Sequence, residues 1–252
     1  KEMDMINGGI AGNLIIFALP VAFSSIMQQL FNSADVAVVG RFAGDNALAA
    51  VGSCVALVGI FVNLIVGLSV GPNAVLANLI GQNKRERISG MMHTILAFGL
   101  ILGGGLMVIG MLTARTILEL SGTPESVMGQ ALLYIWIYFT GIPFIVICNF
   151  GSAILRSFGD TRHPMYYLII SGVVNVALNL FLVICFHMGV AGVAIATVLS
   201  NILSAALVLI CLYRRDDEFQ FRFRRLRLEK DGLSKVLVIG IPSGIQGAIF
   251  SI

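Results

Sequence analysis

The amino-acid sequence predicts an all-α polytopic membrane protein, organised as a bundle of six transmembrane helices. Hydrophobic residues make up 58% of the 252 residues and charged residues only 12%, about half the charged fraction of a soluble domain. The apolar residues gather in runs that reach or exceed the ~20 residues an α-helix needs to cross a bilayer core. A transmembrane barrel would instead show alternating segments of about 10 residues. Composition and run length therefore favour a helical membrane bundle over a barrel or a soluble helical protein.

Six apolar runs are complete, and a seventh begins near the end of the sequence. The six cover about 11–39, 47–80, 91–113, 127–155, 165–187 and 189–213, and the seventh starts near Lys235. Three of the runs contain a proline, at Pro20, Pro72 and Pro143. Proline is tolerated in transmembrane helices but kinks or loosens them, which is common in spans of every kind.

Lysine and arginine are distributed unevenly over the connections between the runs. If the runs alternate in direction, 14 of the 16 basic residues fall on one side of the membrane, and only Arg41 and Arg115 fall on the other. Positively charged loops stay in the cytoplasm, so the N-terminus is predicted to be cytoplasmic and the protein to lie in the cytoplasmic (inner) membrane. The basic segment 214–234 is expected to lie against anionic lipid. This interpretation is favoured over a nucleic-acid interface, and no nucleic-acid partner is predicted.

The basic segment also divides the sequence. The first run contains Pro20, a stretch of small residues and then Gln28, and the start of the seventh run shows a similar pattern around Pro242. Such internal repeats are common in transporters. We therefore expect residues 1–213 to form a six-helix lobe, 214–234 a cytoplasmic linker and 235–252 the start of a second lobe, cut within its first helix. The full-length protein is expected to carry the rest of that second lobe.

Polar side chains recur at helical spacing inside several runs. Leaving an acid in hydrocarbon costs at least ~2.5 kcal/mol, so polar and acidic residues in such positions usually face a cavity and have a function. In the first run the polar residues share one helical face, and the fourth, fifth and sixth runs offer further polar residues. They are Ser24, Gln28, Asn32 and Asp35; Tyr134, Tyr138 and Asn149; Ser171, Asn175 and Asn179; and Thr197, Asn201 and Ser204. Three or four helices are thus expected to converge on one hydrated chamber.

Each of these residues also has a simpler interpretation. Ser, Thr and Asn in membrane helices often only hydrogen-bond a neighbouring helix. For Asp35 the alternative is an acid near the outer end of its helix, held in the interface beside Arg41. The apolar run continues past Asp35 through residues 36–39, which favours a position inside the membrane.

The sequence contains no pattern typical of a catalytic or metal centre. It has no glycine-rich phosphate loop, no Ser/His/Asp set and no Cys-x-x-Cys pair. The cysteines are interpreted as small buried hydrophobic residues, and the histidines as isolated residues at run ends and in loops. These residues are Cys54, Cys148, Cys185 and Cys211, and His93, His163 and His187. We therefore predict that the protein is not an enzyme and has no cofactor.

Several motifs, taken in their order and spacing, resemble the multidrug and toxic compound extrusion (MATE) transporters, most closely the DinF-like branch. The motifs are Pro20…Gln28…Asp35 followed by Gly40 and Arg41, "ALAAVG" (47–52), "AILRSFGDTRHPMY" (153–166), "NVALN" (175–179), "GVAGVAIATVLS" (189–200) and "IPSGIQ" (241–246). The resemblance covers the whole sequence. It implies one lobe of a two-lobe, twelve-helix antiporter, in a superfamily that also includes exporters of lipid-linked oligosaccharides.

The resemblance also implies roles for individual residues. Pro20 would bend its helix as an acid in the first run is protonated. At position 179 the family has a second acid, whereas this sequence has Asn179, so the site carries one carboxylate. A lone carboxylate can be protonated or can hold Na⁺ with neighbouring oxygens, and the choice between H⁺ and Na⁺ stays open. The residues implied for coupling, including a possible Na⁺ site, are Asp35, Asn175, Asn179 and Thr197, with Tyr134.

The implied activity is export of amphipathic organic cations, driven by H⁺ or Na⁺. Uptake of the coupling ion would neutralise Asp35 and favour release of the substrate. The substrate cavity is expected to include Gln28, Asn32, Phe31, Met27, Tyr138 and Asn149. One alternative is a flippase for lipid-linked precursors, whose cavity would be expected to hold Arg or Lys. Another is a half-length membrane module that dimerises or does not transport.

Overall fold

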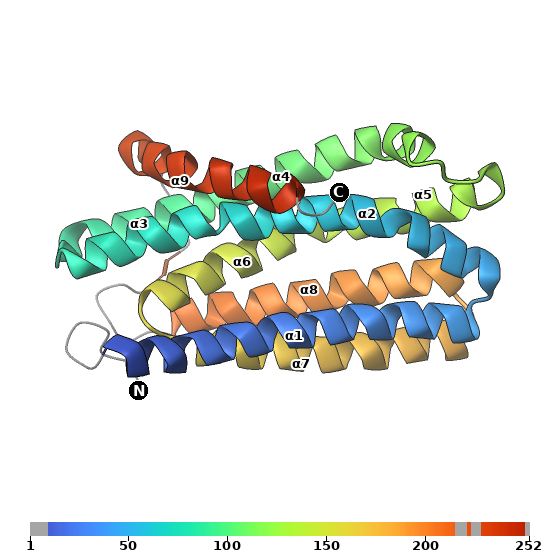
Figure 1. Cartoon of the computed structure of the whole chain (residues 1–252), viewed down its shortest axis with the longest axis horizontal. Helices are drawn as coiled ribbons and strands as arrows, with labels where there is room; N and C mark the ends of the chain where they lie inside the picture. The colour runs from blue at the N-terminus through green and yellow to red at the C-terminus, as the bar shows by residue number, and fades with distance from the viewer. Residues whose placement is uncertain (1–9, 215–220, 223–227, 250–252) are drawn as a thin grey trace.

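A computed structural model describes residues 10–214, 221–222 and 228–249, with side chains from residue 18 onward except at 230–231. Helices account for most of this part of the chain (Figure 1). Their bounds are α1 Ile10–Phe42, α2 Asp45–Leu68, α3 Val70–Gly81, α4 Arg85–Leu120, α5 Glu125–Thr140, α6 Ile142–Ser157, α7 Arg162–Leu180, the π-helical turn η1 Phe181–Cys185, α8 Gly189–Tyr213 and α9 Lys230–Ile249. The predicted fold class is confirmed.

The helices follow the order of the predicted apolar runs. Five are long and apolar enough to cross a membrane: Asp45–Gly81, Arg85–Leu120, Arg162–Cys185, Gly189–Tyr213 and Gly232–Ile249. The pair Glu125–Thr140 and Ile142–Ser157 passes the same test if it is one bent span, which gives up to six. These helices were found among the described residues alone; α1, with 33 residues, corresponds to the first predicted run.

Two of the predicted spans are interrupted close to a proline. α2 and α3 meet at Ser69, three residues before Pro72, and α5 and α6 meet at Gly141, two residues before Pro143, with a bend of 43°. Proline has no N–H to donate to the carbonyl four residues earlier, which weakens the helix at these positions. Pro20 behaves differently, because α1 continues through it without a break.

The helices alternate in direction, so their connections gather at two ends of the bundle (Figure 1). The α3–α4 and α6–α7 connections lie at the same end as the start of α1 and the end of α8. The described basic residues in or beside these connections are Lys84, Arg85, Arg87, Arg156, Arg162 and Arg214. Arg41 and Arg115 belong to the opposite end. The charge asymmetry that the sequence predicts is therefore an asymmetry between the two ends of the folded bundle.

α8 is the central helix of the bundle and packs against α5, α6 and α7, while α1 packs mainly along α7. The interior is apolar and closely filled, with Phe139 and Phe150 fully buried. Large apolar side chains also cover the outside: Leu112 is 77%, Leu120 83% and Val238 70% exposed. Exposure of this much apolar surface to water would be unfavourable, whereas contact with lipid tails is not.

α9 lies along α2 and α3 (Figure 1) and approaches their backbones closely. A Cβ atom on Gly67 would overlap the carbonyl oxygen of Ser243, and one on Gly71 would overlap the carbonyl oxygen of Val236. Small residues permit this kind of backbone contact between membrane helices. α9 begins at Lys230, inside the predicted linker, and the division into two lobes stays a prediction.

The described part of the segment between α8 and α9 is attached to the start of α4. His93 is 2% exposed; its Nε2 accepts the backbone N–H of Arg222 (3.1 Å), and its ring stacks on Phe221 with centroids 5.4 Å apart. The backbone N–H of Glu229 donates to Oγ1 of Thr94 (3.3 Å). His93 is therefore not the isolated residue that the sequence predicts. Residues 215–220 and 223–227 of the predicted linker lie outside the described part of the chain.

Candidate cation and substrate site

Asp35 of α1 lies against α7. Its Oδ1 accepts a hydrogen bond from Nδ2 of Asn179, at 2.5 Å. Close packing of the two helices brings the side chains together: Phe31, one turn before Asp35, occupies the space beside Gly172, where a Cβ atom would overlap the phenyl ring. Asp35 is half-buried, whereas Asn179 is fully buried. A glycine on α7 thus allows an acid of α1 to reach the interior of the bundle.

The hydrogen-bond network continues from Asn179 to α8. Asn179 Nδ2 also donates to Oδ1 of Asn175 (3.2 Å), and Asn175 Nδ2 donates to Oγ1 of Thr197 (3.4 Å). Thr197 in turn donates to the carbonyl of Val193 (2.9 Å). The two asparagines are one turn apart on α7, which is why both face the same neighbours. Three helices therefore contribute to one polar cluster, as the stripes in the sequence predict.

One atom of the cluster lacks a partner. Oδ1 of Asn179 is buried and makes no hydrogen bond with any described residue. Buried polar atoms are nearly always hydrogen-bonded, and an exception calls for an explanation such as a bound ion or water. Rotation of the Asn179 amide would exchange its oxygen and nitrogen, turning a carbonyl oxygen toward Asp35. Among the described residues, the Asn179 oxygen is therefore an unused hydrogen-bond acceptor in the side chain that contacts Asp35.

A cavity of about 80 Å³ opens beside the cluster, between α1, α7 and α8. It is large enough for a few water molecules or a hydrated ion. Among the described residues that line it, Asp35 is the only charged one. The lining residues are Gln28, Phe31, Asn32 and Asp35 of α1; Leu168, Ser171, Gly172 and Asn175 of α7; and Thr197, Ser200 and Asn201 of α8.

Other residues proposed from the sequence lie outside this cavity. Ser24 donates to the carbonyl of Pro20, Asn149 donates to the carbonyl of Ile145, and Ser204 contacts Cys148. Met27 does not line the cavity. Tyr134 and Tyr138, on α5, are buried and stack on each other with ring centroids 6.0 Å apart. Both tyrosines are close enough for an electrostatic interaction with Asp35, so they neighbour the acid without lining the cavity.

Sequence reasoning missed Ser200, Leu168 and Gly172 as lining residues. Ser200 lies three residues after Thr197 and one before Asn201, so the helical spacing of the α8 stripe contained the signal. Leu168 and Gly172 are apolar, so the polar pattern of the sequence gave no signal for them. Their position follows only from the packing of α7 against α1.

The alternative for Asp35, an interfacial acid beside Arg41, is not what the structure shows. Among the described residues no ion pair joins the two, and the partner of Asp35 comes from α7. Asp35 faces the interior of the bundle, although two turns of α1 follow it.

The MatE family model matches residues 20–181, which is more than half of the chain. The chain belongs to the MatE family. The resemblance to MATE transporters that the sequence motifs predict is thereby confirmed.

Relatives of this MatE chain include proteins named for drug resistance. The "Probable multidrug resistance protein YoeA" of Bacillus subtilis is 31% identical over 247 residues, which cover 95% of this chain and 53% of the relative. The "Probable multidrug resistance protein NorM" of Thermotoga maritima is 28% identical over 250 residues, covering 96% of this chain and 53% of the relative. The chain thus spans about half the length of the curated relatives it matches.

Solved structures of MATE proteins have the same fold. A crystal structure of MATE in the bent conformation superposes with a TM-score of 0.86 at 26% identity, over 92% of this chain and 52% of that one. An outward-facing multidrug resistance MATE transporter gives 0.85 at 25% identity, over 93% of this chain and 52% of that one. The MatE chain is therefore a multi-pass membrane protein of a transporter family, and it matches about half of a MATE transporter.

Proposed function

We propose that this MatE chain is part of a cation-coupled antiporter that exports amphipathic organic cations across the cytoplasmic membrane, with Asp35 as the coupling group. The observation that carries the proposal is the position of Asp35: an acid at the cavity between α1, α7 and α8, in contact with Asn179. The names of relatives, which include a "Multidrug export protein MepA" of Staphylococcus saprophyticus, support export of drug-like molecules.

Coupling requires that ion and substrate weaken each other's binding. When Asp35 is ionised, it attracts an organic cation to the cavity, and Phe31 in the lining offers an apolar and aromatic surface. When Asp35 is neutralised by H⁺ or by a bound Na⁺, that attraction is lost. Ion uptake from outside therefore releases the substrate outward, and ion release to the cytoplasm prepares the site for the next substrate.

The polar cluster suits either ion. Na⁺ would find oxygens on Asp35, Asn175 and Thr197, and rotation of the Asn179 amide would add the carbonyl oxygen that now lacks a partner. A proton on Asp35 would turn the carboxyl into a donor, and the same rotation would supply its acceptor. Asn179 can therefore supply an oxygen in both states without adding a second negative charge beside Asp35.

A flippase of the same superfamily is the first alternative. One solved structure, "Reverse polarity of binding pocket suggests different function of a MOP superfamily transporter from Pyrococcus furiosus Vc1 (DSM3638)", superposes with a TM-score of 0.85 at 25% identity, over 93% of this chain and 52% of that one. The described lining of the cavity in this chain includes an acid and no Lys or Arg. An anionic cavity favours an organic cation over the phosphate groups of a lipid-linked precursor.

The second alternative is a half-length module that dimerises or does not transport. Relatives and solved structures are about twice as long as this chain, which favours a second lobe in the full-length protein. α9 would then be the first helix of that lobe, and we propose the division at 1–213, 214–234 and 235–252 on this basis. Sequencing of the complete gene distinguishes the two arrangements.

Equilibrium binding tests the proposed coupling directly. The affinity of the purified full-length protein in detergent for a fluorescent organic cation should fall when Na⁺ is added or when the pH is lowered. The expected change is about 5- to 150-fold, the usual range of coupling between two ligands. Fluorescence anisotropy titrations at several Na⁺ concentrations and pH values measure it. Asp35→Asn should bind the cation weakly and without dependence on either ion, whereas Asp45→Asn, an exposed acid at the start of α2, should behave like the wild type.

The direction of transport depends on the orientation of the bundle. We propose that the end carrying the α3–α4 and α6–α7 connections is cytoplasmic, because most of the basic residues lie there. In a background without native cysteines, Ser121→Cys should react with an impermeant maleimide in intact cells. Gln82→Cys should react only after permeabilisation. Both positions are exposed, at opposite ends of α4. The reverse labelling pattern would invert the proposed orientation.

A further inference from the structure

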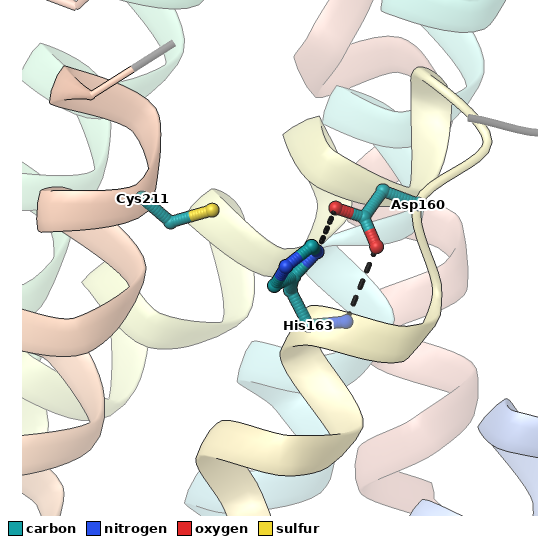
Figure 2. A group of neighbouring side chains, drawn as sticks. All are labelled: Asp160, His163 and Cys211. Atoms are coloured by element: carbon teal, nitrogen blue, oxygen red, sulfur yellow. Dashed lines mark hydrogen bonds and ion pairs between the residues drawn. The ribbon is translucent and has the colours of Figure 1, made fainter. Parts of the chain in front are cut away.

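Three side chains of different chemistry meet where α7 begins and α8 ends. Asp160 belongs to the connection between α6 and α7, His163 to the first turn of α7 and Cys211 to the last turns of α8. Figure 2 shows the Cys211 side chain directed from α8 toward the His163 ring and the Asp160 carboxylate. A carboxylate oxygen, a ring nitrogen and the thiol sulfur all lie within 4.8 Å of one another.

Helix capping accounts for part of this cluster. Oδ1 of Asp160 accepts the backbone N–H of His163 (3.1 Å), and Oδ2 lies 2.5 Å from Nδ1 of its ring (Figure 2). These contacts satisfy an N–H at the start of α7. They do not explain Cys211, which comes from a different helix nearly 50 residues later. Tyr167, one turn after His163, also interacts with Cys211, so the thiol is in polar surroundings.

We propose that Asp160, His163 and Cys211 bind a Zn²⁺ ion that joins the start of α7 to the end of α8. One thiolate, one imidazole and one carboxylate form a mixed sulfur, nitrogen and oxygen set, which zinc accepts and which Mg²⁺ or Ca²⁺ does not favour. Three protein ligands leave a fourth position for water. His163 is exposed and the other two are half-buried, so the ion and this water can enter from the aqueous side.

The geometry requires only small adjustments. With bond lengths of about 2.0–2.3 Å, the ligand atoms of a tetrahedral zinc site lie roughly 3.3–3.8 Å apart. The longest separation present, up to 4.8 Å, must shorten by about 1 Å, which a side-chain rotation can supply. The direct contact between Asp160 and His163 must lengthen by a similar amount, so that the ion replaces it. The backbone N–H of His163 can keep the second carboxylate oxygen.

The zinc site is separate from the cavity of Asp35. Asn175 lies 12 residues after His163 on α7, and Thr197 lies 14 residues before Cys211 on α8, which correspond to about 18 and 21 Å along the helix axes. The ion would fix the relative position of α7 and α8 at their shared end. Because both helices also contribute to the cavity, zinc would hold in place the two helices against which Asp35 packs.

Cobalt is the probe for the first test, because a Co²⁺–thiolate bond gives a charge-transfer absorption that water and carboxylates do not. The purified full-length protein, freed of metal with a chelator, should bind one Co²⁺ per chain with this absorption, and Zn²⁺ should displace it. Cys211→Ser should abolish the absorption. His163→Ala and Asp160→Asn should keep part of it but weaken the affinity about 10-fold or more, as expected when support for a metal site is lost.

Matched controls exist at the other end of the bundle. Cys185 and His187 are exposed to a similar or greater degree and lie close in sequence, so Cys185→Ser and His187→Ala should leave Co²⁺ binding unchanged. Zn²⁺ should raise the melting temperature of the wild type and of these controls, but not that of Cys211→Ser or Cys211→Ala. Cys211→Ser and Cys211→Ala are both tested, so that a folding defect in one variant does not decide the result. Absence of the charge-transfer band in folded wild-type protein, or its persistence in both Cys211 variants, would overturn the proposal.

Discussion

Gradient-driven export should disappear in Asp35→Asn while folding and membrane insertion survive. Asparagine keeps the shape of the side chain and can still pair with Asn179, but it cannot change its charge. A group that cannot alternate between an anion and a neutral form cannot exchange a cation for substrate. Stability should be equal or slightly higher, because an acid inside the membrane costs at least ~2.5 kcal/mol and the asparagine does not.

Proteoliposomes with an imposed H⁺ or Na⁺ gradient measure this effect, with a fluorescent organic cation as cargo. We expect transport by Asp35→Asn at the level of protein-free liposomes, and transport by Asp45→Asn at the wild-type level. Melting temperatures of both variants check their folding. Full gradient-driven transport by Asp35→Asn would remove the coupling role and leave Asp35 as a structural partner of Asn179. Loss of transport in both variants would indicate general damage instead.

Gly67→Ala combined with Gly71→Ala should displace α9 and destabilise the full-length protein. A Cβ atom at either position would overlap a backbone carbonyl of α9, and a backbone cannot rotate away as a side chain can. Overpacking of this kind costs about 1–3 kcal/mol for each site. We expect a clearly lower melting temperature in detergent and reduced transport.

Gly52→Ala is the matched control, because Gly52 lies on the same helix α2 with no atom within 4 Å of an added Cβ. Alanine is the better helix former by about 0.5–1 kcal/mol, so Gly52→Ala should melt at or above the wild-type temperature. If the double variant melted like Gly52→Ala, α9 would not approach α2 and α3 as closely as the structure shows.

Much of the candidate site could be predicted from the sequence. The cost of burying an acid singled out Asp35, and the 3.6-residue period placed Gln28 and Asn32 on its face. The same period paired Asn175 with Asn179. These predictions rest on local rules, since a helix fixes the relative direction of residues three and four apart. The cavity contains members of three of the four predicted polar sets for that reason, and none of the set Tyr134, Tyr138 and Asn149.

Other features depend on how distant helices pack, and the sequence did not contain them. The period alone cannot say that Ser204 faces α6 rather than the cavity, nor that Tyr134 and Tyr138 stack on each other outside the cavity. His163 and Cys211 are 48 positions apart and show no metal-binding spacing, so the sequence predicted an isolated histidine and a buried hydrophobic cysteine. Their meeting with Asp160 follows from the antiparallel packing of α7 and α8.

The attachment of Phe221, Arg222 and Glu229 to α4 changes how the connection between α8 and α9 acts mechanically. Sixteen residues separate the two helices, and a free chain of that length would reach roughly 50 Å. The hydrogen bonds to His93 and Thr94 fix the connection at two points. The chain therefore cannot extend to its full length while these bonds hold. The connection therefore acts as a short strap that holds the start of α9 beside α4, at the basic end of the bundle. A rotation of α9 about that end would strain such a strap less than a movement that carries the start of α9 away from α4.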